Sequence, residues 1–290
     1  MPSNKLMQLD EIEAIAAQFV NLGVKKIRLT GGEPLARKDA AHIILALSKL
    51  PVKLTLTTNG SRIHEFIAVF KTAGINSINV SLDTLDSSKF HQITKRNQFK
   101  QVIDNIELLI KEGFHVKVNM VVMRDFNDNE ILDFIEWTKN NPVHVRFIEF
   151  MPFAGNQWQN EKVFTYQEIL TLAATKYPFK KLIEEPNETA KEYQTIGHQG
   201  TFAVISTMSA PFCHNCNRLR LTADGKMKNC LFSKGEADIL GAFRSGKDIT
   251  PLIQQCLLEK AQALGGQMQG DYHQINPETI LNRSMIKIGG

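Results

Sequence analysis

Apolar residues in the first half of the chain alternate between two spacings. Runs with apolar positions three and four residues apart, typical of amphipathic helices, are each followed by a short β-branched run, typical of a strand. The helical spacing covers residues 9–20, 43–50, 66–70, 102–110 and 131–137, and the strand-like runs cover residues 26–30, 54–58, 78–83, 116–122 and 145–150. Strands that alternate with helices in this way predict βαβ units and a parallel sheet.

Polar residues stand at the ends of the strand-like runs, among them Thr30, Thr58, Ser81 and Glu149. Because parallel α/β folds bind ligands at the carboxyl ends of their strands, we expect these residues to face one mouth. The first element is a helix, whereas a right-handed crossover needs a parallel strand on each side. We therefore expect the chain to begin inside a βα unit whose opening strand is absent. The alternative is a helix that decorates the end of the barrel.

The pattern changes after residue 150. A loop is followed by a mixture of helix and polar turns up to residue 200, then by a strand over residues 201–206, the cysteine segment and a helical remainder up to residue 282. This change predicts two regions. Residues 1–152 would form a partial barrel, and residues 153–290 a C-terminal region.

The composition is that of an ordinary globular protein. With 43% hydrophobic and 22% charged residues among 290, the chain is neither disordered nor fibrous. No stretch approaches the roughly 20 apolar residues of a membrane span, and a net charge of +4 is too small to indicate a nucleic-acid partner. Few cysteines and the lack of a secretory or transit signal at the N-terminus predict a reducing, cytoplasmic compartment.

Three of the four cysteines predict a metal centre. Cys213 and Cys216 form a C-x2-C pair, and Cys230 follows after 13 residues. Structural zinc needs four ligands, so His214 or Cys256 would have to complete the set. A [4Fe–4S] cluster held by three cysteines would instead leave one iron with an open position. The spacing alone leaves zinc and iron–sulfur open.

Basic residues accompany this motif. Arg218 and Arg220 follow the cysteine pair directly, and two residues that are two apart on a strand share a face. Arg28, Lys117 and Arg146 interrupt apolar strands, so we expect them to point into the barrel lumen, where buried cations need anionic partners. Together these residues favour a site for a triphosphate or a carboxylate. A solvated strand face and structural ion pairs are the alternatives.

Glycines mark two further candidates. Gly31 and Gly32 allow a ligand to approach the backbone closely, and the carboxylate of Glu33 can accept from an ammonium group. A plain βα turn is the alternative. The terminal pair Gly289 and Gly290 is either a frayed end or a tail without side chains that enters a narrow pocket.

Taken together, these motifs resemble the GTP 3′,8-cyclase family, the radical S-adenosylmethionine (SAM) enzymes of molybdenum-cofactor biosynthesis. The stretches that carry the resemblance are residues 30–35, 56–60, 79–83 and 146–151, the cysteine segment 213–230 with its arginines, and residues 288–290. The resemblance implies an α/β fold, namely an incomplete TIM-type (β/α)6 barrel without its first strand, closed on its open side by a C-terminal α+β layer. It also implies a lyase that converts GTP with SAM to (8S)-3′,8-cyclo-7,8-dihydroguanosine 5′-triphosphate by radical chemistry.

The resemblance further implies the site residues. A [4Fe–4S] cluster whose open iron faces GTP would be bound by Cys213, Cys216 and Cys230, which favours iron–sulfur over zinc. The implied GTP contacts are Arg28, Thr57, Lys117, Arg146, Arg218 and Arg220. The implied SAM contacts are Gly31, Gly32, Glu33, Ser81 and Met151. The implied catalytic residues are Arg218, Arg220, Gly289 and Gly290, the last two as a tail that reaches the active site.

The sequence departs from the family in one respect. The family's second [4Fe–4S] cluster, which cleaves SAM, is held by a C-x3-C-x2-C loop after the first strand, and no cysteine precedes Cys213 here. We therefore expect a fragment of a cyclase. The alternatives are a GTP- and cluster-binding module that cannot cleave SAM, and a zinc-stabilised phosphate-binding barrel.

The partners that the resemblance implies are small molecules and one enzyme. They are GTP, SAM, a reductant, the cyclic pyranopterin monophosphate synthase that takes the product, and a second copy of the chain in a homodimer. Neither a nucleic acid nor a membrane is expected.

Overall fold

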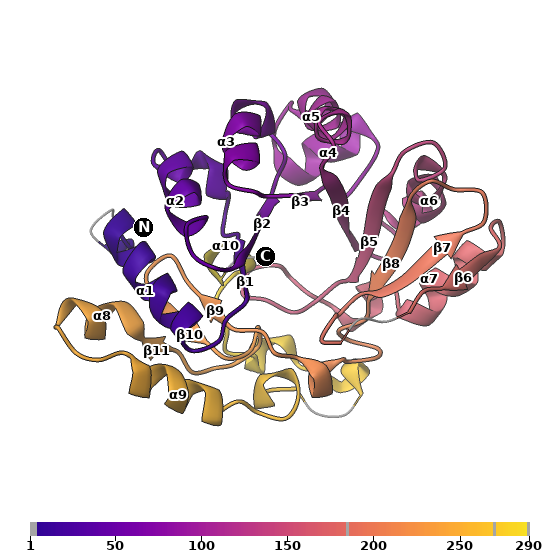
Figure 1. Cartoon of the computed structure of the whole chain (residues 1–290). Coiled ribbons are helices and arrows are strands. Elements are labelled where there is room, and N and C mark those ends of the chain that lie inside the picture. Colours follow the sequence, from indigo (N-terminus) through magenta and orange to yellow (C-terminus); the bar gives the residue numbers. More distant parts are fainter. Residues whose placement is uncertain (1–4, 184–185, 269–270, 289–290) are drawn as a thin grey trace.

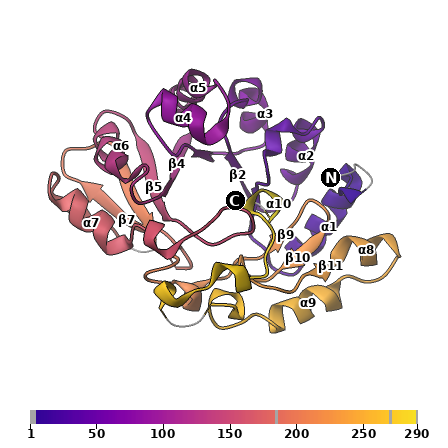
Figure 2. The same ribbon diagram turned by 180° about the vertical axis from the view of Figure 1, so that it is seen from behind.

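A curved sheet with helices on its outer side forms most of the molecule (Figures 1 and 2). The computed structural model describes residues 5–183, 186–268 and 271–288. The eight strands of the sheet follow the order β1-β2-β3-β4-β5-β8-β7-β6. Their bounds are β1 (Lys26–Leu29), β2 (Lys53–Thr58), β3 (Ser77–Ser81), β4 (His115–Val122), β5 (Val143–Glu149), β6 (Phe179–Lys181), β7 (Lys191–Thr195) and β8 (Thr201–Ile205).

Strands β1 to β5 and β8 run parallel, and β7 and β6 add antiparallel strands at one edge. This arrangement confirms the predicted parallel sheet and the positions of its first five strands. The register places Thr57 opposite Asn79, Asn79 opposite Lys117, and Lys117 opposite His144. Because residues that are directly opposite share a face of a sheet, one row of polar side chains crosses the lumen.

Among the described residues, seven α-helices accompany this sheet, and five of them were predicted. Their bounds are α1 (Leu9–Asn21), α2 (Ala40–Leu47), α3 (Ile67–Thr72), α4 (Ser87–Thr94), α5 (Phe99–Lys111), α6 (Ile131–Trp137) and α7 (Tyr166–Ala174). Helix α4 was missed because Phe90 is its one buried residue. Its start is fixed by the Asp86 carboxylate, which accepts a hydrogen bond from Lys89 N at 2.6 Å.

The C-terminal region adds a small antiparallel sheet with strands in the order β11-β10-β9. The bounds are β9 (Arg220–Leu221), β10 (Lys226–Lys228), β11 (Ala237–Asp238), α8 (Ile239–Arg244), α9 (Thr250–Leu258) and α10 (Met285–Ile288). The prediction of a helical remainder between the cysteine segment and residue 282 is confirmed at α8 and α9 and is wrong at β11. Strands of two or three residues carry too few alternating positions to leave a pattern.

The two predicted regions share the main sheet. Strand β8, which follows residue 152, pairs in parallel with β5, and β6 and β7 extend the same sheet. The small sheet packs on α1 through an apolar cluster that includes Ile15, Phe19, Met227 and Ile239. The boundary between residues 152 and 153 stays a prediction. In the described parts of the chain, no helix combines the length and the apolar character needed to cross a membrane.

Candidate functional site

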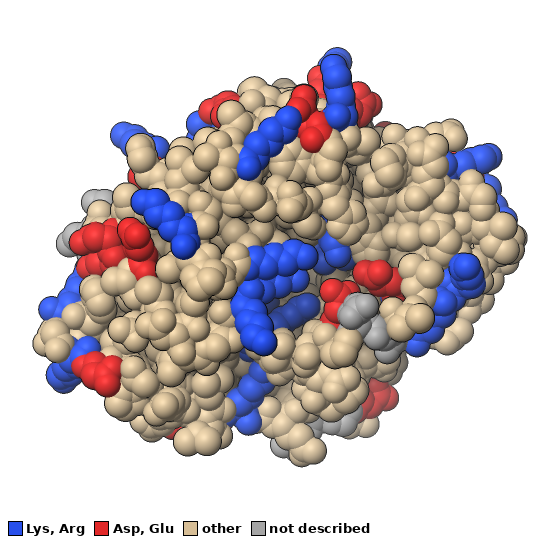
Figure 3. All heavy atoms as spheres, viewed as in Figure 1, with Lys and Arg blue, Asp and Glu red and all other residues tan. Residues whose placement is uncertain are grey.

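Five cations lie together in the lumen. Arg28 of β1, Lys117 of β4 and Arg146 of β5 interact electrostatically with one another, and Arg218 and Arg220 approach them from the C-terminal region. Figure 3 shows Lys and Arg side chains gathered in the hollow at the centre of one face. The sequence predicted this convergence. The prediction that Arg218 and Arg220 share one strand is wrong, because β9 begins at Arg220.

Desolvation in the lumen disfavours the charged form of these cations, although the side chains of Arg28 and Arg218 are exposed. Desolvation, with Arg28 and Arg218 nearby, lowers the pKa of Arg146 to about 9, and only 7% of this residue is exposed. Desolvation and the neighbouring Arg218 lower the pKa of Arg220 to about 10. The pKa values of Arg28, Lys117 and Arg218 are lowered too, in each case mainly by burial. An anion that entered the lumen would relieve this cost.

Neutral oxygens hold the guanidinium groups of Arg146 and Arg218. Arg146 Nε donates to Asn119 Oδ1 at 2.8 Å, whereas Arg218 donates from Nη2 to a threonine hydroxyl at 2.6 Å. Within the described ranges, Arg28, Lys117, Arg146 and Arg218 form no ion pair with a carboxylate closer than 4.0 Å. The Glu188 carboxylate interacts with these four cations at longer range, so their charge is partly offset and not directly paired.

A cavity of about 250 Å³ lies near one of these cations. Its lining includes Glu188, Thr189, Phe212, His214 and Asn215. Thr189 is the hydroxyl partner of the Arg218 guanidinium. The cavity therefore lies next to the partner of one lumen cation and beside the start of the cysteine segment, and none of the five cations lines it.

The three cysteines of the predicted centre lie beside the cations as free thiols. Cys216 and Cys230 both interact electrostatically with Cys213 and with Arg220. Burial, with these two thiols nearby, raises the pKa of Cys213. Cys256 packs in a different apolar cluster, against α1 and α8, so it is not part of this set. No three His, Cys, Asp or Glu groups of the described residues converge closely enough for a single metal ion.

Two donors face the cysteine sulfurs. Leu264 N donates to Cys213 Sγ at 3.3 Å. The ammonium of Lys260 lies 3.8 Å from Cys216 Sγ and donates to two carbonyl oxygens, Cys216 O at 2.7 Å and Arg218 O at 3.3 Å. Donors aimed at sulfur stabilise thiolates and the clusters that they bind, so the residues present fit an iron–sulfur cluster. No sequence pattern indicated Lys260, which is 44 residues from Cys216 along the chain.

The Gly-Gly-Glu-Pro turn follows β1, where a SAM contact was predicted. Gly31 has a φ of +133°, which favours glycine. Glu33 accepts hydrogen bonds at Oε1 from Thr58 Oγ1 at 2.8 Å and Leu35 N at 3.0 Å, and at Oε2 from Asn59 N at 2.6 Å. The carboxylate therefore fixes the turn against the end of β2. Its role toward an ammonium group stays a prediction.

The other predicted SAM residues lie at neighbouring strand ends. Ser81 is the last residue of β3 and is exposed, and the partly exposed Met151 follows β5. Helix α10 packs against the same mouth, because a Cβ at Gly32 would lie 3.2 Å from Ile286 Cγ2. The predicted catalytic tail, Gly289 and Gly290, lies outside the described residues.

Glu149, predicted to face the mouth, acts as an anchor. It is 0% exposed and accepts hydrogen bonds from Tyr166 N at 2.8 Å, Met208 N at 2.7 Å, Ser209 N at 2.9 Å and the Ser209 hydroxyl. This carboxylate ties the end of β5 to the start of α7 and to the turn that precedes the cysteine segment. The Glu149 carboxylate therefore helps to fix the position of the turn that leads to Cys213.

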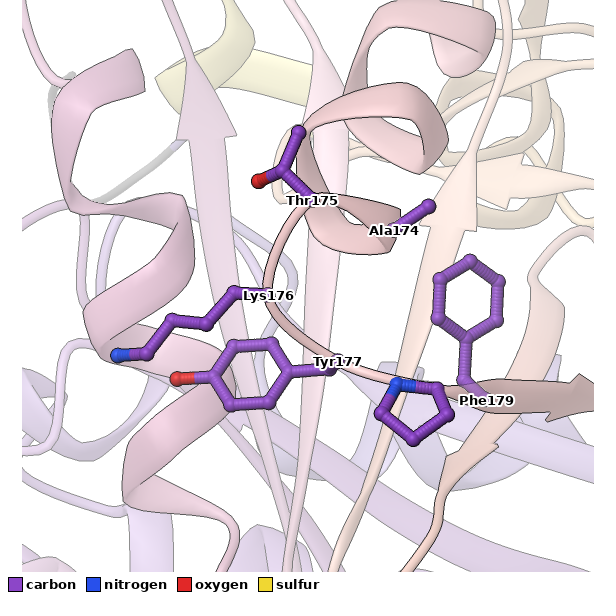
Figure 4. A pocket seen from close by; sticks show the side chains of 6 residues that line it. Ala174, Thr175, Lys176, Tyr177 and Phe179 are labelled. Carbon is purple, nitrogen blue, oxygen red and sulfur yellow. The ribbon is translucent and has the colours of Figure 1, made fainter.

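A second hollow lies at the far end of α7, where residues 174–179 line it (Figure 4). The Lys176 ammonium lies 5.1 Å from the ring centroid of Tyr177, and the Tyr177 hydroxyl donates to Glu136 at 2.6 Å. None of the predicted site residues lines this hollow.

Two family models match the chain. The model described as Radical SAM superfamily matches residues 1–138, and the model described as Molybdenum Cofactor Synthesis C matches residues 143–265. SuiB of Streptococcus suis, in a structure with S-adenosylmethionine, is similar in fold, with a TM-score of 0.57 at 14% identity over 88% of this chain and 62% of that one. The fold and the family models are thus those of a radical SAM protein.

The proteins that are similar in sequence define the family more narrowly than the family models and the fold do. The mitochondrial GTP 3′,8-cyclase of Arabidopsis thaliana is 41% identical over 100% of this chain and 74% of its own length. The GTP 3′,8-cyclase of Peptoclostridium acidaminophilum is 37% identical over 98% of this chain and 86% of its own. Molybdenum cofactor biosynthesis protein 1 of Drosophila melanogaster is 41% identical over 95% of this chain, which spans only 50% of that protein. The chain belongs to the GTP 3′,8-cyclase family, which confirms the resemblance predicted from its motifs.

Proposed function

We propose that this chain binds GTP for the cyclisation that opens molybdenum-cofactor biosynthesis, with the triphosphate on the lumen cations and the base toward the three cysteines. One observation carries the proposal, namely that five cations, of which Arg146 is buried and Arg28 and Arg218 are exposed, converge beside three free thiols. The cations and the thiols lie around one lumen. A nucleotide has a charged triphosphate end and an aromatic base end, so it could contact both groups at once.

The residues divide into two groups by what they would hold. Arg28, Thr57, Lys117, Arg146, Arg218 and Arg220 would bind and orient the triphosphate. The cysteines would hold the cluster, which when bound supplies one iron without a protein ligand to accept a donor atom of the base. Fixing the nucleotide at both ends leaves the ribose in one position, and this restriction of geometry is how such a site favours reaction at a single carbon.

We place SAM at the Gly-Gly-Glu-Pro turn, Ser81 and Met151. These positions stand at the carboxyl ends of β1, β3 and β5, at one mouth of the parallel sheet. In this family SAM is the source of the radical that removes hydrogen from C3′ of the ribose. The lumen walls would keep water from it.

The GTP site is tested by Arg218→Ala and Arg220→Ala. Each replacement removes a charge-assisted contact and should weaken GTP binding by about 1.5–3 kcal/mol, measured by titration calorimetry. Arg124→Ala is the matched control, because Arg124 pairs with Glu168 at 2.8 Å outside the lumen. Unchanged GTP affinity in both lumen variants would refute the placement of the triphosphate.

The metal assignment has its own test. Anaerobic reconstitution should load about four irons per chain, and replacing the three predicted ligands by serine should abolish the loading. Cys256→Ser should load iron as the wild type does, because Cys256 packs away from the cysteine set. Stoichiometric zinc without iron would favour the zinc-stabilised phosphate-binding barrel instead.

A second candidate function is a GTP- and cluster-binding module that does not cleave SAM. It is favoured by the absence of any cysteine before Cys213 in the 290 residues. Formation of 5′-deoxyadenosine from SAM by the reduced, reconstituted protein would exclude this candidate. An in-frame C-x3-C-x2-C motif upstream of the Met1 codon would show that the cyclase is a longer protein.

We further infer an incomplete (β/α)6 barrel, supported by the curvature of the parallel sheet, with the C-terminal layer on its open side (Figure 1). The free thiols support a reducing, cytoplasmic setting with a dedicated reductant. The product would pass to cyclic pyranopterin monophosphate synthase. A homodimer is also proposed, and its mass in light scattering would test it.

A further inference from the structure

Asn79 of β3 lies between the cations of β1 and β5 and is only 2% exposed. Guanidinium nitrogens only donate, so the amide atom that faces them must be the oxygen. In that orientation the oxygen accepts from Arg146 Nη2 at 2.9 Å, from Thr57 Oγ1 at 3.1 Å and from Arg28 Nη1 at 3.2 Å. One buried oxygen therefore joins three residues from three other strands.

The neutrality of this oxygen matters for an anion site. An aspartate has the same shape, but its carboxylate would pair with both guanidiniums and cancel one of the positive charges. An amide fixes the direction of the guanidiniums and leaves their charge intact. Asn119, which accepts from Arg146 Nε at 2.8 Å, supports the same guanidinium in the same way.

We propose that Asn79 is a positioning residue of the triphosphate site, whose uncharged oxygen aligns Arg28 and Arg146 without competing with phosphate. This inference rests on the proposed function, because it requires phosphate groups at these guanidiniums. Asn79 acts through its neighbours and is not itself assigned a contact with the ligand.

The decisive variant is Asn79→Asp, which changes charge and almost nothing else. The dissociation constants for GTP and for inorganic tripolyphosphate should both rise at least about ten-fold, and by the same factor. The midpoint of thermal unfolding should be unchanged or higher, since the desolvated guanidiniums of Arg28 and Arg146 gain a counter-charge. A residue with a merely structural role would not combine weaker binding with undiminished stability.

Asn105→Asp is the matched control. Asn105 is 3% exposed and its amide donates to Gly60 O at 2.7 Å, between α5 and the loop after β2 and outside the cation cluster. A new charge there faces the His64 ring, whose Nδ1 lies 3.2 Å from Asn105 Oδ1, and not the lumen cations. Stability should fall because the hydrogen bond to Gly60 O is lost, while the affinity of the folded protein for tripolyphosphate stays the same. Asn79→Ala, which removes the acceptor without adding charge, should bind GTP with an affinity between those of the wild type and Asn79→Asp.

The outcomes separate this inference from the function on which it rests. If the wild type binds GTP and Asn79→Asp binds it equally well, the positioning role is refuted and the proposed function stands. Failure of Asn79→Asp to fold would also overturn the role, because charge compensation predicts retained stability. If the wild type binds neither GTP nor tripolyphosphate, the proposed function fails and the role fails with it.

Discussion

Replacing Glu149 by glutamine should destabilise the protein and impair the cysteine site together. The carboxylate, 0% exposed, accepts four hydrogen bonds, two of them from Met208 N and Ser209 N in the turn before the cysteine segment. A glutamine keeps one acceptor oxygen and turns its NH2 group toward donors. At least two of the charge-assisted hydrogen bonds are therefore lost.

The expected size follows from those bonds. Each hydrogen bond to a buried charge contributes about 1.5–3 kcal/mol, so after relaxation the loss should be about 3–5 kcal/mol in the free energy of unfolding. For a chain of this length, that corresponds to a fall of about 5–8 °C in the midpoint of thermal unfolding. Because the turn leads directly into Cys213, iron loading after reconstitution should also fall.

Urea denaturation and iron content of Glu149→Gln, both compared with the wild type, measure the two effects. Glu161→Gln is the control, since Glu161 is exposed and follows β5 in the same connection to α7. A loss below about 1 kcal/mol in Glu149→Gln, with unchanged iron loading, would refute the anchoring role.

Three further outcomes are expected. Gly60→Ala should lower the free energy of unfolding by about 2–4 kcal/mol in denaturant titration, because φ is +82° and a Cβ would lie 2.8 Å from Val80 Cγ1. Lys260→Met removes the ammonium 3.8 Å from Cys216 Sγ, so the cluster potential in an EPR-monitored titration should fall by about 50 mV, and no change would contradict this contact. Burial raises the pKa of Asp83 to about 6, so the folded state holds more protons than the unfolded state between about pH 4 and 6. Stability should therefore fall as pH rises through that window, and Asp83→Asn should remove about 2–3 kcal/mol of that fall in denaturation curves.

Sequence periodicity predicted the elements that are long enough to repeat their pattern of apolar and polar positions. Strands β4 and β5 have eight and seven residues, and α5 has thirteen, so each shows its buried face several times. Helix α4 and strands β6 and β7 were missed because their sequences are mostly polar and partly exposed. They are held by neighbours that are remote in sequence, which a local pattern does not reveal.

The candidate site shows the same division. The types and strand positions of Arg28, Lys117 and Arg146 predicted a lumen anion site, because a cation in an apolar strand is itself a signal. Asn79 and Glu149 lie within the stretches that carry the family resemblance, yet their roles depend on which atoms meet after folding. The Asn79 amide contacts two guanidinium groups, and the Glu149 carboxylate accepts four hydrogen bonds. Composition and residue spacing do not predict either of these contacts.

The pairing of β8 with β5 has a practical consequence for anyone who divides this protein. Five residue pairs, from His144 with Thr201 to Ile148 with Ile205, would be severed in a polypeptide cut after residue 152. In the first piece, the edge of β5 that pairs with β8 would be exposed. The second piece would contain β6, β7 and β8 without the parallel strands on which they pack. Neither half should be soluble when expressed alone, whereas co-expression should let them reassemble. For the same reason, swapping the C-terminal half between distant relatives should succeed only when β5 travels with it.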